Sequence, residues 1–303
     1  MHQITTMKKK LSEKEEKEFQ EWLKRDDDST CETYHDYATY VLPDLDYKYQ
    51  LIAIKNLVAV HKDISDKNTQ EIETLNEAIE KVTRRDYKEY LFGQRGEQLY
   101  VNSYVNAAHS MAAVGMLAPF MESIFFQSFL GIEKGENESF FPDLNIDLVE
   151  NKSSNLHQRW VQATHEKWDC HFVWHKNRRQ EDLVKGILQL SEATGLKEFL
   201  PEDLEITLKV LFAYRNKMFH FGLEWPSEER EKFWQRIQNE KWPSNWIEAA
   251  TKNNDEHLII YISDAFITHC LDSAEAIIDG ISRFVFKAAE QQLKQYNKRV
   301  SEN

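Results

Sequence analysis

Apolar residues recur at helical spacing along most of this chain. Residues 49–64 are strongly apolar, and residues 68–92 repeat apolar side chains every three or four positions, at Ile72, Leu75, Ile79 and Val82. Because this is the period of an amphipathic α-helix, both stretches are predicted to be helical. Residues 98–130 are apolar enough for one or two buried helices, which Pro119 is expected to kink or divide.

The second half of the chain repeats this pattern with clearer helix ends. Residues 155–195 are predicted to be mostly helical. Pro201, followed by two acidic residues, suits the first turn of a helix, and Ser263 suits the N-cap of a long C-terminal helix. A shorter helix is predicted from Ser227. Only "HLIIYIS", residues 257–263, has the composition and length of a strand.

The predicted fold is therefore all-α or nearly so, with room for one short strand or hairpin. Only 9 Gly and 6 Pro occur among 303 residues, and this scarcity of turn residues favours long helices. The two glycines of "GQRGE", residues 93–97, predict a break. We expect an N-terminal helical region at 1–97, beginning with a charged helix at 8–28, then a helical domain at 98–295 and a flexible tail at 296–303.

Charge and cysteine content narrow the class of protein. The net charge of -13 argues against a broad nucleic-acid-binding surface, so any contact with nucleic acid must be local. Three cysteines, Cys31, Cys170 and Cys270, are odd in number and widely spaced, which favours a reducing cytoplasm over a disulfide framework. The chain has no uninterrupted apolar run of membrane-spanning length and no secretory signal, so neither a membrane span nor export is expected.

The most informative stretch is "LFAYRNKMFHFGLEW", residues 211–225. Leu204, Leu208 and Leu211 define a core-facing stripe on the preceding helix, and Arg215 takes the next place on it. A guanidinium there must be paired or must line a cleft, because an unpaired buried charge is very costly. Asn216 and His220, four residues apart, share a neighbouring face with Phe212, and Gly222 suits the helix end, at the C′ position.

These groups suit phosphodiester chemistry. Arginine binds phosphate through two parallel hydrogen bonds, and histidine transfers protons near neutral pH. "RNKMFH" resembles the Arg-x4-6-His signature of HEPN domains, helical domains found in many prokaryotic ribonuclease toxins and defence proteins. Asn216 matches the usual residue after the arginine. The motif covers residues 215–222, and the helical surroundings resemble the family over about 98–290. Some toxin members carry a tyrosine two residues after the histidine, where this chain has Gly222.

The resemblance implies a metal-independent endoribonuclease acting in toxin or antiviral defence, without a cofactor. It implies a homodimer in which two motifs form one composite cleft that binds RNA, and an antitoxin or defence-system protein as partner. Arg215 would stabilise the phosphorane charge, Asn216 would orient the phosphate or the imidazole, and His220 would act as general acid or base. The expected products are a 2′,3′-cyclic phosphate and a 5′-hydroxyl, and the 2′-hydroxyl nucleophile would select RNA.

Other interpretations of the same residues stand beside this one. Arg215 could pair with a buried carboxylate such as Glu122, which lies among apolar residues in "PFMESIFF". His220 could then simply cap the helix end, and the domain would be a non-catalytic module that binds a nucleotide or a protein. Glu122 could also support the site directly, since related domains often place a polar residue on an earlier helix.

Residues 151–180 contain two further candidates. His165, Cys170, His171 and His175 gather there, and the last two are spaced to share a metal on a helix, although no second ligand cluster follows. The favoured interpretation is that these are packing or surface residues, and no metal is expected. Six basic residues interleaved with tryptophans in the same region would suit single-stranded RNA, but a solvated face over core tryptophans is the favoured interpretation.

Overall fold

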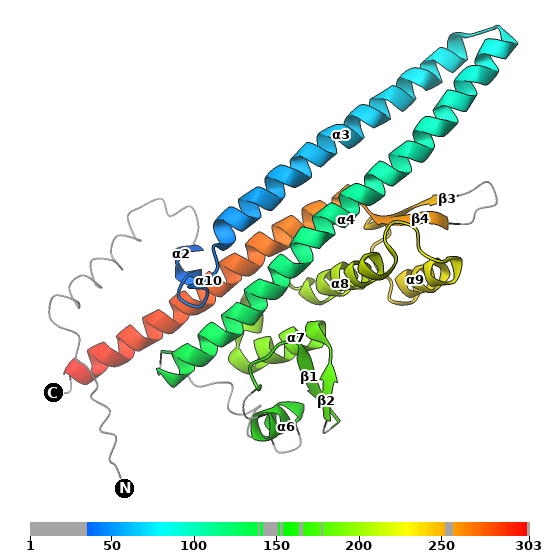
Figure 1. Cartoon of the computed structure of the whole chain (residues 1–303). Helices are drawn as coiled ribbons and strands as arrows, with labels where there is room; N and C mark the ends of the chain where they lie inside the picture. The colour runs from blue at the N-terminus through cyan, green and yellow to red at the C-terminus, as the bar shows by residue number, and fades with distance from the viewer. Residues whose placement is uncertain are drawn as a thin grey trace.

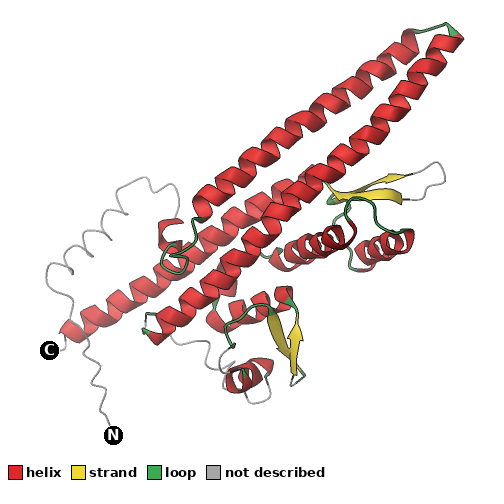
Figure 2. Ribbon diagram, in the orientation of Figure 1, coloured by secondary structure: helices red, strands yellow, loops and turns green. Residues whose placement is uncertain are grey.

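The computed structural model describes residues 35–138, 140–141, 151, 154–163, 166–176, 178–251 and 257–301. The helix predicted at residues 8–28 lies outside this part. The described chain is mostly helical, which confirms the predicted fold class, and it contains two small two-stranded sheets (Figure 2).

Two long helices dominate the molecule. Helix α3 (Tyr47–Lys81) and helix α4 (Arg85–Asn137) pack antiparallel and form a hairpin whose far half projects away from the other elements (Figure 1). Helix α10 (Asp264–Ser301) packs against the near half of α4 and against the short helix α2 (His35–Ala38). This arrangement gives α4 two environments, one exposed along the hairpin and one buried in the body.

The remaining elements gather along one side of α4 (Figure 1). Helix α8 (Leu204–Phe221) packs on α4 and is followed by α9 (Ser227–Asn239) and by the antiparallel strands β3 (Ile247–Thr251) and β4 (His257–Ile262). A second group consists of α6 (Asn155–Gln162), the antiparallel strands β1 (Phe172–His175) and β2 (Arg178–Glu181), α7 (Leu183–Thr194) and the 3₁₀ helix η1 (Leu196–Phe199). Both groups meet near the middle of the body.

One core joins these elements. Fully buried side chains come from α4, α7, α8 and α10, and they include Leu117, Ile124, Ile187, Leu208, Leu211, Ile277 and Ile281. Burial of each such side chain contributes roughly 1.5–3 kcal/mol relative to exposure. The core therefore fixes the position of α8 against α4, which matters for the site below.

Several predicted helix ends are confirmed. The backbone N–H of Phe266 donates to Ser263 Oγ over 3.2 Å, so Ser263 caps α10 as expected. The predicted helix at Ser227 and the predicted strand at 257–263 are present as α9 and β4. Helix α8 starts at Leu204 instead of Pro201, whose carbonyl accepts a hydrogen bond from the Leu204 N–H over 3.2 Å.

Helix α4 corrects two predictions. It runs unbroken through residues 93–97, so the expected boundary between 1–97 and 98–295 falls inside one helix. Pro119 also lies within α4 and does not divide it. Because Pro119 is exposed, water can hydrate the carbonyl that loses its N–H partner.

Part of α4 has the length and composition of a membrane-spanning helix. One 18-residue window in Arg85–Asn137 is apolar enough by those two measures, and 56% of that window is buried inside the protein. Core helices of soluble proteins share these properties, so this observation by itself assigns no membrane span.

Residues 155–195 are the third correction. They are not mostly helical, because β1 and β2 form a hairpin between α6 and α7. Phe172, Val173 and Trp174 of β1 are all buried, and a short apolar run of this kind cannot be assigned to helix or strand by periodicity alone.

Candidate functional site

The end of α8 carries the three residues predicted from the motif. Leu204, Leu208 and Leu211 are buried as expected, and 26% of the Arg215 side chain, next on their stripe, is exposed. Helix α8 ends at Gly222, which has φ 69° and donates its N–H to Met218 O over 2.9 Å. Glycine adopts a positive φ more readily than other residues, so the predicted stop is confirmed.

Arg215 is held by three neighbours. Its Nη1 donates to Glu122 Oε2 of α4 over 2.6 Å, which is the ion pair considered from the sequence. Its Nε donates to Asn216 Oδ1 over 3.3 Å, and its guanidinium carbon lies 5.2 Å from the centre of the Phe212 ring. Phe212 is buried although Asn216 is exposed, because the helix emerges from the core at this turn.

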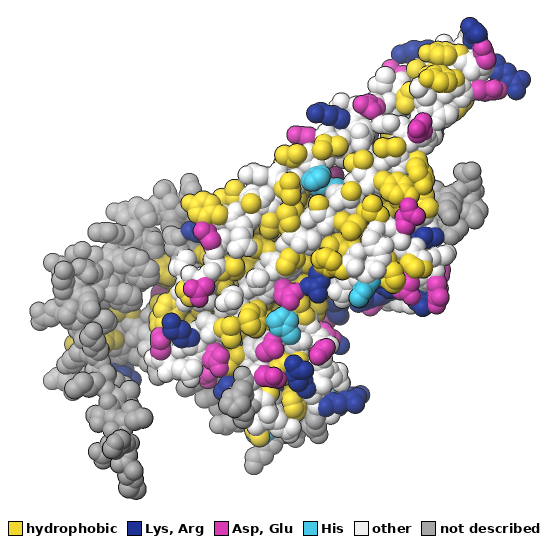
Figure 3. All heavy atoms as spheres, viewed as in Figure 1, with side chains coloured by type: hydrophobic (Ala, Val, Ile, Leu, Met, Phe, Trp, Pro, Cys, Tyr) yellow, Lys and Arg dark blue, Asp and Glu magenta, His cyan; other side chains and the backbone are white. Residues whose placement is uncertain are grey.

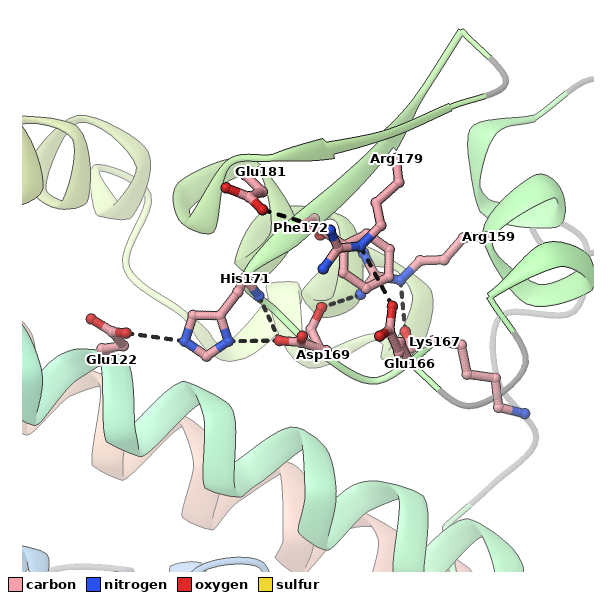
Figure 4. Close-up of polar contacts among 9 residues, drawn as sticks. All are labelled: Glu122, Arg159, Glu166, Lys167, Asp169, His171, Phe172, Arg179 and Glu181. Carbon is pink, nitrogen blue, oxygen red and sulfur yellow. Dashed lines mark hydrogen bonds and ion pairs between the residues drawn. The ribbon is translucent and has the colours of Figure 1, made fainter.

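Glu122 also contacts an imidazole that sequence reasoning had placed elsewhere. Its Oε1 lies 3.0 Å from His171 Nε2, and His171 Nδ1 lies 2.6 Å from Asp169 Oδ1 (Figure 4). The backbone N–H of His171 donates to the same Asp169 oxygen over 2.9 Å. Arg215, Glu122, His171 and Asp169 therefore form a continuous row of alternating charge types, which we call the four-residue network.

The environment of His171 favours its protonated form. Burial lowers the pKa of His171, but the hydrogen bonds and charges of Asp169 and Glu122 outweigh that effect, so the pKa lies above its ordinary value. The Phe126 ring of α4, 5.3 Å from the imidazole, covers part of it.

The buried side chain of Arg159 holds the turn that presents Asp169 and His171. Arg159 of α6 is fully buried and donates to three backbone carbonyls, those of Lys167 at 2.6 Å, Asp169 at 2.5 Å and Phe172 at 2.8 Å (Figure 4). Its guanidinium also lies 4.2 Å from the centre of the Phe172 ring. Burial lowers the pKa of Arg159 to about 10, which leaves it cationic at neutral pH.

Helix α7 holds the same turn from another side. A Cβ atom at Gly186 would lie 2.0 Å from Cys170 O and 2.6 Å from Phe172 O, so only glycine permits this approach. Asp182 caps α7 by accepting a hydrogen bond from the Lys185 N–H over 3.0 Å. The imidazole of His171 is thus positioned by a packed framework of α6, α7 and β1.

A cavity of about 820 Å³ opens beside the four-residue network. Its lining includes His171, Arg215 and Asn216, together with charged residues on or at the ends of β2, α7, α8 and α9: Glu181, Asp182, Lys185, Lys209, Arg236 and Glu240. The basic and acidic side chains are mixed, and Figure 3 shows the same mixture over one face of the molecule. The site is therefore not a broad basic groove.

His220 lies one turn beyond this cavity and is not among its lining residues. Its side chain is exposed, and within the described chain its one aromatic contact is with Phe221, at 6.2 Å between ring centres. Phe219 beside it is 69% exposed. The motif is thus divided, with Arg215 and Asn216 at the cavity and His220 on the open surface.

The cysteine–histidine cluster does not have the geometry expected from the sequence. His171 and His175 do not share a helical face, because His175 lies on β1 and His171 precedes it. The possible ligand atoms of Asp169, Cys170 and His171 lie within 4.8 Å of one another. However, both ring nitrogens of His171 have carboxylate partners, and burial raises the pKa of the Cys170 thiol to about 12. His165 lies outside the described residues.

Part of the basic and aromatic stretch at 151–180 is internal. Arg159 is internal, and Trp168 and Trp174 are buried in the core. Arg179 lies 3.5 Å from Glu166 and 3.8 Å from Glu181. The structural interpretation of these side chains is therefore the better one.

Asp169 was missed at the sequence level. The signal available was "DCH", an acid two residues before a histidine, but such a pair is common, and Glu122, the other partner of His171, is 49 residues before that histidine. Comparisons with protein-family models, curated proteins and solved structures find no match to this chain. The resemblance to HEPN domains therefore rests on the α8 motif and its helical surroundings.

Proposed function

We propose that this chain is a metal-independent endoribonuclease of the HEPN type that acts in toxin or antiviral defence. The observation that carries the proposal is the arrangement on α8. Arg215 and Asn216 line a cavity of about 820 Å³, and His220 follows one turn later on the open surface. An arginine and an accessible imidazole at one helix end are the groups that RNA cleavage through the 2′-hydroxyl requires.

In this reaction the phosphate binds at Arg215, which stabilises the charge that develops on the phosphorane. Asn216 orients the phosphate, and His220 accepts the proton of the attacking 2′-hydroxyl. The products are a 2′,3′-cyclic phosphate and a 5′-hydroxyl. Because the nucleophile belongs to the RNA, none of these steps needs a metal ion, and DNA is not cleaved.

We further propose that two copies of the chain form the working site. The end of α8 exposes His220 beside Phe219, which is 69% exposed. A second copy would cover this ring and bring two motifs together in one RNA-binding cleft. An antitoxin or defence-system protein would then control the site by occupying the same surface.

A second candidate function follows from the Arg215–Glu122 ion pair. An arginine already bound to a carboxylate over 2.6 Å is neutralised, which suits a non-catalytic module that binds a nucleotide or a protein. The two candidates differ in whether Arg215 releases Glu122 when a phosphate arrives.

The test is cleavage of a fluorescent single-stranded RNA by purified protein in EDTA. Wild type is compared with His220→Ala and with His175→Ala, an exposed histidine on β1 that does not line the cavity. We expect cleavage by wild type and His175→Ala, a loss on the order of 100-fold or more in His220→Ala, and a cyclic phosphate at the new 3′ end.

Equal cleavage by all three proteins would assign the activity to another site or to a contaminant. Intact RNA with all three would favour the binding module. Binding of the same RNA or of a nucleotide, lost in Arg215→Ala, would then support that second candidate.

A further inference from the structure

The cavity beside Arg215 contains an imidazole that the proposed reaction has not used. His171 lines this cavity together with Arg215 and Asn216, whereas His220 does not. Cleavage of a phosphodiester through the 2′-hydroxyl is fastest with two proton-transfer groups, one that accepts a proton from the nucleophile and one that donates a proton to the leaving oxygen. A second His220 would come from the partner copy, but within one chain His171 is the imidazole that lines the cavity with Arg215.

A carboxylate on one ring nitrogen holds the imidazole of His171, as is common for catalytic histidines in enzymes. Asp169 Oδ1 binds its Nδ1 over 2.6 Å, and Nε2 points away toward Glu122 (Figure 4). A carboxylate on one ring nitrogen fixes the orientation of the imidazole and favours its cation, and the other nitrogen is then directed to the reacting atoms. The support of the turn by Arg159 and Gly186 keeps this geometry rigid.

Glu122 bridges His171 and Arg215. One of its oxygens lies 3.0 Å from His171 Nε2, and the other accepts from Arg215 Nη1 over 2.6 Å. A phosphate also offers two oxygens at similar spacing, so it can take both contacts if the Glu122 side chain turns away. The exposed fractions of these side chains, 42% for His171 and 26% for both Glu122 and Arg215, leave them within reach of a ligand.

We propose that His171 is the general acid of this site and donates the Nε2 proton to the 5′-oxygen of the cleaved RNA. The inference rests on the proposed ribonuclease function. In the step, a bond forms between the 2′-oxygen and phosphorus while the bond between phosphorus and the 5′-oxygen breaks. His220 takes the proton of the 2′-hydroxyl, and His171 gives one to the leaving 5′-oxygen. Exchange with water restores both imidazoles, and no oxidant or metal takes part.

The charges around His171 suit an acid. Glu122 on α4 and Asp169 in the turn before β1 raise the pKa of His171, although burial opposes them. With His171 protonated, the four-residue network holds two positive and two negative charges. The other charged groups of the cavity are Glu181, Asp182, Lys185, Lys209, Arg236 and Glu240. The donor form exists below the raised pKa, so the rate should fall as the pH rises through it.

The test compares two RNA substrates. One has the natural 5′-oxygen at the cleavage position, and the other carries sulfur in its place, which leaves as a thiolate without a proton. His171→Ala should lose on the order of 100-fold in rate on the oxygen substrate and should cleave the sulfur substrate as fast as wild type does. His220→Ala should be slow on both, and His175→Ala should match wild type on both.

Three outcomes would overturn the inference. If His171→Ala cleaves the oxygen substrate like wild type, His171 is not the acid, and the ribonuclease function stands. If His171→Ala is slow on both substrates, its role is to hold the site in place. If wild type cleaves neither substrate, the ribonuclease function itself is wrong, and the role of His171 falls with it.

Asp169→Asn provides a variant that keeps the imidazole. The amide removes the negative charge of Asp169 beside Nδ1 and lowers the pKa of His171, so the alkaline limb of the rate profile should move to lower pH. An unmoved limb in a folded Asp169→Asn protein would contradict the assignment. Thermal unfolding of each variant checks that it is folded.

Discussion

At the scale of single residues, the side chain that most determines the position of His171 does not itself line the cavity. Arg159 lies fully buried under the turn of Asp169 and His171, and its partners are mainly backbone carbonyls. The charge is tolerated because several of its N–H groups meet a strong acceptor. From the sequence, Arg159 was expected on a solvated face, but its physical role is to shape the backbone that presents His171.

Replacing Arg159 by leucine should therefore be costly. The three carbonyls would lose charged donors, and we expect the free energy of unfolding to fall by about 3 kcal/mol or more. Urea denaturation measures this, with Arg178→Leu on β2 as the matched control, because Arg178 is exposed. The control should change by less than about 0.5 kcal/mol. Similar small effects in both variants would contradict the assigned role.

At the scale of elements, two glycines show how context decides the effect of one residue type. Gly186 of α7 faces the Cys170 and Phe172 carbonyls at distances that no Cβ atom could keep. Gly96 of α4 has open space around it, since no atom beyond its own stretch of helix lies within 4 Å of its would-be Cβ. A side chain therefore cannot fit at Gly186 but can fit at Gly96.

We expect Gly186→Ala to lower the free energy of unfolding by about 1–3 kcal/mol through overpacking. Gly96→Ala should raise it by up to about 1 kcal/mol, because alanine favours the helix. Thermal unfolding measured by circular dichroism compares the two variants with wild type. A stabilised Gly186→Ala protein would show that the contact between α7 and the turn before β1 is looser than described.

The elements also differ in how far the sequence predicts them. Helices α8, α9 and α10 could be predicted, because apolar spacing and end residues agree in each. The prediction of a break at 93–97 was wrong. Glycine within a helix costs only about 1 kcal/mol, and packing of α3 along α4 outweighs that. The β1–β2 hairpin was missed because a short buried run has no distinguishing period. The four-residue network was beyond sequence reasoning, except for Arg215 and Glu122, because it joins three segments that meet only in the fold.

At the scale of the whole molecule, the open end of α8 predicts self-association. Phe219→Glu would place a charge on the surface that we propose two copies share. We expect wild type to form a dimer and Phe219→Glu to be monomeric and to lose RNA cleavage with it. Val161→Glu on α6 is the control, since Val161 is also exposed, at 57%, and lies on another element. A dimeric Phe219→Glu protein would contradict the proposed interface.

The long hairpin of α3 and α4 determines which method can distinguish a monomer from a dimer. Helix α4 has 53 residues, which at 1.5 Å per residue makes it about 80 Å long. A particle of this shape experiences more friction than a sphere of equal mass, so a single chain should elute early from a size-exclusion column, where a compact dimer would. Elution volume alone would therefore report a dimer even for a monomer. Light scattering or sedimentation equilibrium, which measure mass without reference to shape, will distinguish the two.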